Sequence, residues 1–445
     1  MKSLSFLFCL LLLAASACQN PDPQENWISL FNGKDLSGWK ANENPASFRV
    51  ENGLLIAEGP RSHLFYVGEE GEQSFRNFEL QLEILTHLHA NSGVYYHTTY
   101  QEEGWPSAGH EVQVNNTHIG GGDYRELKKT GSLYSIRNVY KAFAQDSVWF
   151  TMTIRVEGRH LSVKVNDVTT VDYWEPGTDT LSGGTFALQG HDPGSKVYYR
   201  NIRVKRLPDG SPAGDTLPYS AVYDRMIKHQ SNQFAFIDLH VNRDAAFDLT
   251  SALKTTYREG INLGILPDDG TASVSNLAGF PVFAGLEAND RTLLSVVSPE
   301  DLKKFDYTLS NLNVPGDESS AQSDPQTYLE GYFTRIMEGL ADTAIDIWAT
   351  PTLLPSSLRS DYDKIWTETR IHQALALAKA SGIAIEIDNR LRLPDLRFIR
   401  LAKEKGCLFT YSHIAAEADR NDSDYFLTVI DSCGLGYKDF FVPGW

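Results

Sequence analysis

The sequence predicts an all-β sandwich of the jelly-roll type followed by an α/β barrel of seven strands. Through residues 27–207, short runs of alternating apolar and polar residues are separated by Gly and Asn turns. From residue 222 onward, apolar strands alternate with amphipathic helices. Between the two, residues 208–221 are rich in Pro, Gly and Asp and break every period, which is typical of a linker.

The strands of the first half are short and follow one another closely. Phe78, Leu80, Leu82 and Ile84 alternate with Glu and Gln, which predicts a half-buried strand. Residues 150–156 and 161–165 flank Glu157-Gly158 and predict a hairpin, which a further turn at Asn166-Asp167 follows. Many short strands without a long helix favour a sandwich or jelly roll.

The second half has the pattern of repeated strand–helix units. The predicted strands are residues 234–239, 261–266, 282–286, 305–309, 344–348, 383–387 and 408–411, and the predicted helices are 328–340, 362–380, 395–405 and 424–433. Repeated units of this kind produce a parallel sheet covered by helices, and seven of them favour a barrel.

The first residues have the pattern of an export signal. An apolar run over residues 4–13 follows Lys2, and four small residues precede Cys18, which resembles the lipobox of bacterial lipoproteins. We expect residues 1–18 to be a signal peptide with a lipidated Cys18, and residues 19–26 to be a tether. The alternative is ordinary signal-peptidase cleavage nearby, with Cys18 incidental. Either reading exports the protein to the cell envelope, at the periplasmic or the outer-membrane face.

The composition limits the classes of molecule that the protein is expected to bind. A formal net charge of -17 argues against binding to nucleic acid or anionic lipid, since phosphate binding requires clustered Lys and Arg. This charge is compatible with neutral ligands such as sugars. Contact with a membrane is expected through the lipid anchor alone. Beyond the signal and Cys18, the cysteines are Cys407 and Cys433, which either pair or stay buried thiols.

Two predicted strands carry a polar stripe on one face. Alternation places Glu111, Gln113 and Asn115 together, while Val112 and Val114 enter the core. In the same way, Gln189 and His191 share the face opposite Phe186 and Leu188. Such a stripe is often only the solvated side of a sheet. A carboxylate, amides and an imidazole are, however, the groups that bind hydroxyls and move protons.

Six stretches of this half, taken in order, resemble the 3-keto-disaccharide hydrolase family. They are ISLFNGKDLSGW (28–39), NSGVYY (91–96), GHEVQ (109–113), TGSLY (130–134), LQGH (188–191) and YRNIRV (199–204). The resemblance implies a concanavalin-like jelly roll that acts on glycosides with a ketone at sugar carbon 3. That ketone acidifies the carbon-2 hydrogen, so a base can form an enolate that expels the aglycone before water adds back. The chain departs from the family at His97, where an Arg is frequent, and at Phe150, where an Asn is frequent.

The resemblance also implies roles for individual residues. Glu111 is the first candidate for the base or for a metal ligand, so binding of a divalent metal ion at this site is one alternative. His191 is the candidate for proton transfer. Gln113 and Gln189 would orient sugar hydroxyls. The other candidates for substrate binding are Asn91, Tyr134, Lys128 and Trp105. Lys128 would stabilise negative charge or simply be solvated, whereas Trp105 and Tyr100 would stack on a sugar or cover the end of the sandwich. The alternative function is a non-catalytic glycan-binding lipoprotein.

Polar residues also gather where the predicted barrel strands end, as catalytic residues do in parallel barrels. They are Asp238, His240, Asp268, Asp269, Glu287, Asn311, Thr350, Glu386, Ser412 and His413. The stretches DLHVN (238–242), GLE (285–287) and FTYSH (409–413) resemble the polymerase and histidinol phosphatase superfamily, whose barrel binds metal ions.

The barrel pattern departs from that superfamily at three expected histidines, because Asn242, Asn311 and Thr350 stand there. Amides and hydroxyls are poor ligands for zinc-like ions. His240, Glu287, Glu386 and His413 would remain as ligands for one ion. We therefore expect a structural or binding barrel without a transition metal, and the alternative is a surviving metal-dependent phosphoesterase.

Overall fold

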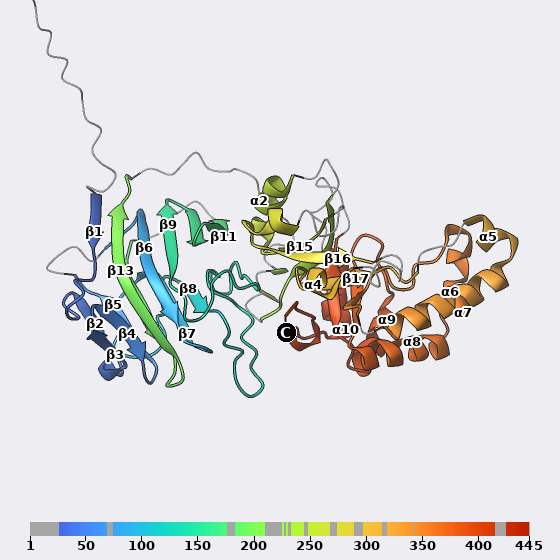
Figure 1. The fold of residues 1–445 in the computed structure, drawn as a ribbon, viewed down its shortest axis with the longest axis horizontal. Coiled ribbons are helices and arrows are strands. Elements are labelled where there is room, and N and C mark those ends of the chain that lie inside the picture. The colour runs from blue at the N-terminus through green and yellow to red at the C-terminus, as the bar shows by residue number, and fades with distance from the viewer. Residues whose placement is uncertain are drawn as a thin grey trace, which may run out of the picture.

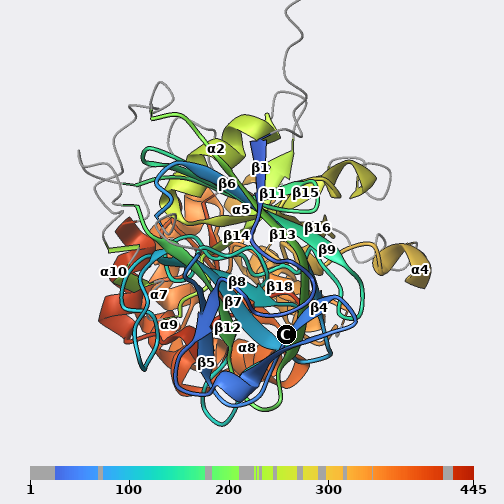
Figure 2. The same cartoon turned by 90° about the vertical axis from the view of Figure 1, so that its left-hand side faces the viewer.

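The computed structural model describes residues 26–68, 74–175, 183–209, 225–226, 228–229, 233–243, 248–267, 274–288, 297–313, 318–342, 344–413 and 424–444. Its antiparallel sandwich and its barrel lie side by side (Figure 1). Seen from the sandwich end, strands β5, β7 and β12 lie in front of the barrel (Figure 2). The predicted signal and Cys18, the residues 19–25 of the tether, most of the linker, and Asp268 and Asp269 lie outside the described residues.

Two antiparallel sheets form the sandwich, as predicted. Among the described residues, an eight-stranded sheet has the order β11-β10-β9-β6-β13-β4-β3 with β1 paired to β13, and a five-stranded sheet has the order β2-β5-β12-β7-β8. The strands are β1 Trp27–Ser29, β2 Trp39–Ala41, β3 Phe48–Glu51, β4 Leu54–Glu58, β5 Ser62–Tyr66, β6 Phe78–Thr86, β7 Asn91–Thr98, β8 His110–Asn115, β9 Phe150–Glu157, β10 His160–Val165, β11 Val168–Trp174, β12 Thr185–Gly190 and β13 Lys196–Arg206. The short 3-10 helix η2 spans Pro45–Ser47.

Alternating apolar residues of the two sheets meet in the sandwich core. In β6, Phe78, Leu80, Leu82 and Ile84 are all at most 1% exposed, while the Glu and Gln between them are half-buried. Strands β9 and β10 form the predicted hairpin, in which Val156 pairs with Leu161. The predicted alternation therefore locates the inward faces correctly.

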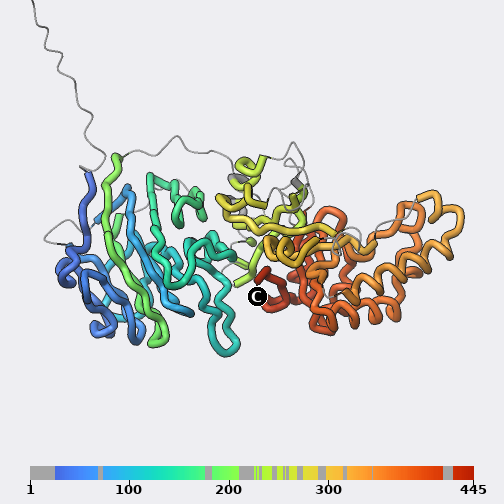
Figure 3. Tube along the Cα trace, viewed as in Figure 1, coloured from blue at the N-terminus to red at the C-terminus, as the bar shows by residue number. Residues whose placement is uncertain are grey.

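In its described residues, the second half contains a closed barrel of seven parallel strands in chain order, which confirms the predicted number, direction and closure of the strands. The strands are β14 Ile237–Arg243, β15 Asn262–Pro267, β16 Val282–Glu287, β17 Tyr307–Ser310, β18 Ile347–Trp348, β19 Ala384–Asp388 and β20 Phe409–Ser412. The helices are α2 Leu249–Glu259, α4 Pro299–Leu302, α5 Glu318–Ser323, α6 Pro325–Leu340, α7 Tyr362–Ile365, α8 Glu368–Ser381, α9 Leu396–Glu404 and α10 Asp424–Cys433, with 3-10 helices η4 Val274–Leu277, η5 Ser356–Asp361 and η7 Tyr437–Asp439. Figure 3 shows the chain path through both halves.

Several elements differ from the sequence-based expectation, and three of them have a clear physical reason. Strand β14 begins three residues later and runs to Arg243, because its pairing with β15 continues past the apolar run to Pro267. The predicted helix over residues 362–380 is two helices, since Thr367 caps a new helix by accepting a hydrogen bond from the Arg370 backbone N–H. Helix α2 was not predicted, although Asp248 caps its start and Gly260, at φ +69°, ends it.

The barrel interior is filled by side chains. Tyr307 is fully buried, and its ring lies where a Cβ atom on Gly264 or Gly285 would come within 2.5 Å of its atoms. Glycine at both positions therefore makes room for a tyrosine in the barrel centre. Cys407 and Cys433 are both free, buried thiols, which decides between the two alternatives. Of the helices in the described part of the chain, none combines the length and apolar character needed to cross a membrane.

Candidate active site

A cavity of about 570 Å³ opens on the polar face of the five-stranded sheet. Its wall consists of Asn91, Tyr95, Trp105, Pro106, Gly109, His110, Glu111, Gln113, Tyr124, Glu126, Tyr134, Ile136, Gln189 and His191. The size is within the range of small-ligand sites. The cavity thus brings together Glu111 and His191, which come from strand β8 and from the end of strand β12.

The carboxylate of Glu111 is held by donors from two other strands. The Tyr95 hydroxyl of β7 donates to Oε2 at 2.7 Å, and the Gln189 amide of β12 donates to Oε1 at 3.0 Å. Because β12, β7 and β8 are neighbours in that order, the Gln189–Glu111 hydrogen bond crosses over the middle strand. Both oxygens therefore have a fixed direction before any substrate arrives.

Gly93 makes this crossing possible. It lies on β7 between the two partners, and a Cβ atom there would come 2.2 Å from Oε1 of Glu111. Any other residue at this position would push the carboxylate away from Gln189. Gly93 of this Asn-Ser-Gly stretch is thus a steric requirement of the site.

Burial tunes the acidity of Glu111. Removal from water raises the pKa of Glu111 to about 7, and nearby Glu126 adds to the rise, while the hydrogen bonds from Tyr95 and Gln189 oppose it. A carboxyl group with a pKa near neutrality is suited to general-base catalysis, since half of it is deprotonated at the working pH while its basicity stays high.

His191 is oriented by its neighbour in the chain. Its Nδ1 lies 2.7 Å from the Asp192 carboxylate, which also accepts a hydrogen bond from the Ser195 hydroxyl at 2.8 Å. Burial alone would raise the pKa of Asp192, but the hydrogen bonds from His191 and Ser195 lower it below its usual value. A carboxylate at Nδ1 fixes the ring and leaves the other ring nitrogen for proton transfer.

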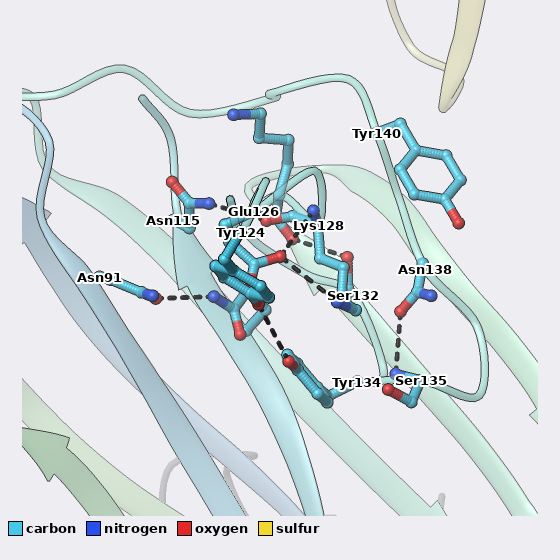
Figure 4. A network of polar contacts seen from close by, with 12 residues as sticks. Asn91, Asn115, Tyr124, Glu126, Lys128, Ser132, Tyr134, Ser135, Asn138 and Tyr140 are labelled. Carbon is cyan, nitrogen blue, oxygen red and sulfur yellow. Dashed lines mark hydrogen bonds and ion pairs between the residues drawn. The ribbon is translucent and has the colours of Figure 1, made fainter. Parts of the chain in front are cut away.

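The opposite wall contains a second carboxylate that the sequence analysis did not identify. Glu126 is 2% exposed, accepts a hydrogen bond from the Tyr124 hydroxyl, and lies 3.5 Å from Lys128 Nζ (Figure 4). Lys128 is also 2% exposed, with Nζ 4.4 Å from the centre of the Tyr134 ring. The expectation that Lys128 is solvated is therefore wrong, because its charge is paired with Glu126 inside the protein.

The remaining predicted residues lie around the cavity, with one exception. The Gln113 amide donates to Asn91 at 2.7 Å, and both line the wall. Trp105 also lines it, is 45% exposed, and packs against His191 with ring centres 5.6 Å apart. Tyr100 instead packs on Phe65 and stays outside this wall. Trp105 is thus placed to stack on a sugar, and Tyr100 covers the sheet.

Strand alternation would have identified one of the missed residues. Tyr95 shares a face with Gly93 and Asn91, two and four residues before it, so its place in the cavity follows from the period of β7. Tyr124 and Glu126 lie in a segment without regular strands, where no periodicity indicates which side chains turn inward.

The donor set does not suit a metal ion at Glu111. Both carboxylate oxygens already accept hydrogen bonds from neutral donors. In the described part of the chain, no three His, Cys, Asp or Glu side chains are grouped so that they could hold a metal. A site for a divalent ion usually gathers several such ligands.

The barrel candidates lie apart from this cavity, at the carboxyl ends of the barrel strands. His240 Nδ1 lies 2.7 Å from Glu386, and its Nε2 lies 4.0 Å from Glu287. Burial alone would lower the pKa of His240, but these carboxylates raise it to about 9. His413 instead contacts the Asn389 amide at 3.0 Å. The structure therefore brings three of the four predicted ligands together, with His240 as an ion-pair partner.

A β-sandwich with a carboxylate, amides and an imidazole around one sugar-sized cavity has the character of a carbohydrate-active domain. In agreement, residues 26–205 match the family described as the 3-keto-alpha-glucoside-1,2-lyase-like domain. This match covers the part of the chain whose motifs resemble the 3-keto-disaccharide hydrolase family.

Individual relatives are more distant. The chain is 28% identical over 85 residues to the 3-keto-disaccharide hydrolase of Bacteroides thetaiotaomicron, a stretch that makes up 18% of this chain and 29% of that protein. A solved structure described as a candidate glycosyl hydrolase from Parabacteroides distasonis has 22% identity and a TM-score of 0.36, covering 42% of this chain and 95% of that one. A galectin-like protein from Bacillus subtilis has 8% identity and a TM-score of 0.31, covering 40% and 94%.

Proposed function

We propose that the sandwich domain cleaves 3-keto-glycosides, with Glu111 as the base. The observation that carries this proposal is a carboxyl group with a pKa of about 7, oriented by Tyr95 and Gln189, in a sugar-sized cavity that also contains His191. The match of residues 26–205 to the 3-keto-alpha-glucoside-1,2-lyase-like family supports the substrate class.

In the proposed reaction, residues on two walls of the cavity carry out different steps. Glu111 takes the carbon-2 hydrogen as a proton, and the released electron pair forms the enolate with the carbon-3 ketone. The second N–H of the Gln113 amide and the Tyr134 hydroxyl are wall donors available to the enolate oxygen. The electrons then form the carbon-1–carbon-2 double bond as the bond to the aglycone oxygen breaks, and His191 protonates that oxygen. Water finally adds its hydroxyl to carbon 1 and gives its proton back to His191, and Glu111 returns its proton to carbon 2.

The test is to incubate the protein with a 3-keto-glucoside and, in parallel, with the unoxidised glucoside. We expect aglycone release from the keto substrate only, because the unoxidised sugar has no acidic carbon-2 hydrogen. Glu111→Gln keeps the size of the side chain and removes the base, so release should fall by about 10²–10⁴-fold. Release that persists in this variant, or no release from the keto substrate, contradicts the proposal.

A non-catalytic glycan-binding protein is the second candidate, since the half-exposed Trp105 beside the amides of Gln113 and Gln189 also suits simple binding. It predicts that the keto and unoxidised sugars both bind in calorimetry and that neither is cleaved.

For the barrel, we propose a domain similar to the polymerase and histidinol phosphatase superfamily that has lost its metal chemistry. Asn242, Asn311 and Thr350 at three expected histidine positions support this, because amides and hydroxyls are poor ligands for zinc-like ions. Metal analysis of the purified protein should find no stoichiometric transition metal, and phosphoesters should not be hydrolysed. A bound metal with phosphoesterase activity would instead support the alternative function.

We further propose that the protein is exported and anchored through a lipidated Cys18. Labelled palmitate should be incorporated into the wild-type chain and not into Cys18→Ala. A Cys18→Ala variant that remains membrane-bound contradicts the anchor and leaves the sugar chemistry unaffected.

A further inference from the structure

One segment of the sandwich, residues 119–141, contacts both the cavity and the barrel, and we call it the docking segment. Successive side chains in it face different ways. Glu126 lines the cavity with Lys128 paired to it, whereas Leu127 between them belongs to the apolar core of the barrel, beside Ile237 and Phe283. The barrel therefore touches the back of the cavity wall.

The docking segment is also bonded to the strand that carries the base. The Tyr134 backbone N–H donates to the Glu111 carbonyl at 2.9 Å. The Gln113 N–H donates to the Ser132 carbonyl at 2.9 Å, and the Gly131 N–H donates back to Gln113 at 3.0 Å. Since β8 is the edge strand of its sheet, these bonds supply the neighbour that the edge lacks.

Polar contacts also join the docking segment to the barrel. The Tyr140 hydroxyl, turned away from the cavity network in Figure 4, donates to the Phe234 carbonyl at 2.8 Å. Lys141 Nζ lies 2.6 Å from the Asp306 carboxylate and donates to the Val282 carbonyl at 3.1 Å. Asn262 adds a hydrogen bond from its amide to the Asn138 carbonyl at 2.9 Å.

These barrel partners share one end of the barrel. Asn262 and Val282 are the first residues of β15 and β16, and Asp306 directly precedes β17. This is the amino end of the strands, opposite to the carboxyl ends that carry Glu287 and Glu386. Contacts at the amino end of a parallel barrel serve stability, and chemistry in such barrels occurs at the other end.

We propose that the barrel is a positioning domain, which holds the docking segment in place so that Glu126, with Lys128 paired to it, and Tyr134 complete the cavity beside Glu111. Leu127, Tyr140 and Lys141 are then positioning residues, because they act through the cavity wall and touch no substrate. The kinetic part of this inference rests on the proposed function. The ordering of the segment by the barrel does not.

The experiment compares two double variants of the full chain. Tyr140→Phe/Lys141→Ala removes one hydroxyl–carbonyl hydrogen bond and one Lys–Asp pair at the interface, together with the hydrogen bond of Lys141 to the Val282 carbonyl. Tyr425→Phe/Lys304→Ala removes the same two kinds of contact within the barrel, where the Tyr425 hydroxyl donates to Pro394 at 2.6 Å and Lys304 lies 2.7 Å from Asp301. Both keep the cavity residues intact.

Hydrogen exchange measures the ordering directly. In the interface variant, the amides of residues 124–134 and of Gln113 should exchange about tenfold faster, while the amides of β9 remain unchanged. The matched control should show wild-type exchange in all three places. Unchanged exchange at residues 124–134 in the interface variant overturns the inference, whether or not the protein has activity.

Kinetics on the 3-keto-glucoside then test the effect on the cavity. We expect kcat to fall about tenfold in the interface variant, with the acid limb of the pH profile shifted to lower pH, because Glu126 raises the pKa of Glu111 more than Lys128 on the same segment lowers it. If the barrel only stabilised the fold, the interface variant would contain a smaller fraction of active protein, with the KM and the pH profile unchanged. Faster exchange with wild-type kinetics and pH profile overturns the positioning role. Absence of turnover in the wild type refutes the proposed function alone, and exchange at Gln113 then decides the inference.

Discussion

The carboxyl group of Glu111 lies between the Tyr95 hydroxyl and the Gln189 amide, and it is only partly exposed to water. Two opposing effects act on it. Burial destabilises the ionised form, and the two hydrogen bonds stabilise it. Burial is the larger effect, so the group stays a base of near-neutral pKa and does not become a permanently charged structural carboxylate.

The same shift makes stability depend on pH. The pKa of Glu111 is raised from 4.5 to about 7 in the folded state, so the stability from this group is complete below about pH 4.5 and is lost as the pH rises through about 7. Between pH 5 and pH 8, the wild type should lose about 1–3 kcal/mol relative to Glu111→Gln. Urea unfolding of both proteins at the two pH values measures this. A difference between the two proteins that does not change with pH would contradict the pKa assignment.

The contact between His191 and Asp192 predicts a second effect at this scale. Asp192→Asn replaces the acceptor at Nδ1 by an amide, so the imidazole loses its fixed orientation. We expect kcat to fall about 10–100-fold, with KM little changed. The matched control is Asp172→Asn, which removes an equal 2.7 Å contact to His160 at the edge of the other sheet and should leave turnover unchanged. Equal kinetics in the two variants would exclude a role for Asp192.

At the scale of elements, the site depends on three adjacent strands, and Gly93 on the middle one is the position where a single methyl group matters. The Cβ atom of Gly93→Ala would collide with Oε1 of Glu111, so the carboxylate has to move. We expect turnover to fall by at least about tenfold with the sandwich still folded. Gly121→Ala is the control, because no atom lies within 4 Å of a Cβ atom there. Circular dichroism separates a displaced base from misfolding, and full activity of Gly93→Ala would contradict the crossing arrangement.

Sequence patterns predict a strand well where one of its faces is buried and the other is exposed to solvent. Alternation identified β6, β8, β9 and β10, because a half-buried strand has a period of two. For β14 the apolar run located residues 234–239 and missed the end of the strand at Arg243, because the buried Asp238 and His240 are polar and interrupt the apolar pattern. The docking segment has no regular strand, so its share of the cavity was not predictable from periodicity.

At the scale of the whole molecule, the apolar core of the barrel includes residues from the sandwich. Leu127 is 3% exposed, and it packs with barrel residues such as Phe283. We expect Leu127→Ala to destabilise the barrel by about 2–4 kcal/mol, because it leaves a cavity in a core to which the barrel contributes most side chains.

Calorimetry measures this effect. The control is Leu161→Ala, which truncates a leucine that is 2% exposed in the core of the sandwich and should destabilise the sandwich transition. A barrel transition that is unchanged by Leu127→Ala would show that the two halves are energetically independent.

The sequence by itself determined the sandwich, the seven-stranded parallel barrel and the polar stripes with Glu111, Gln113, Gln189 and His191, because each follows from local periodicity or from a motif. Only the tertiary structure decided that Gln189 reaches Glu111 over Gly93, that Lys128 is buried beside Glu126, and that Leu127 enters the barrel core. These are contacts between segments that are distant in the chain or lack a repeat. They depend on how whole sheets and domains pack, and a local sequence pattern does not determine that packing.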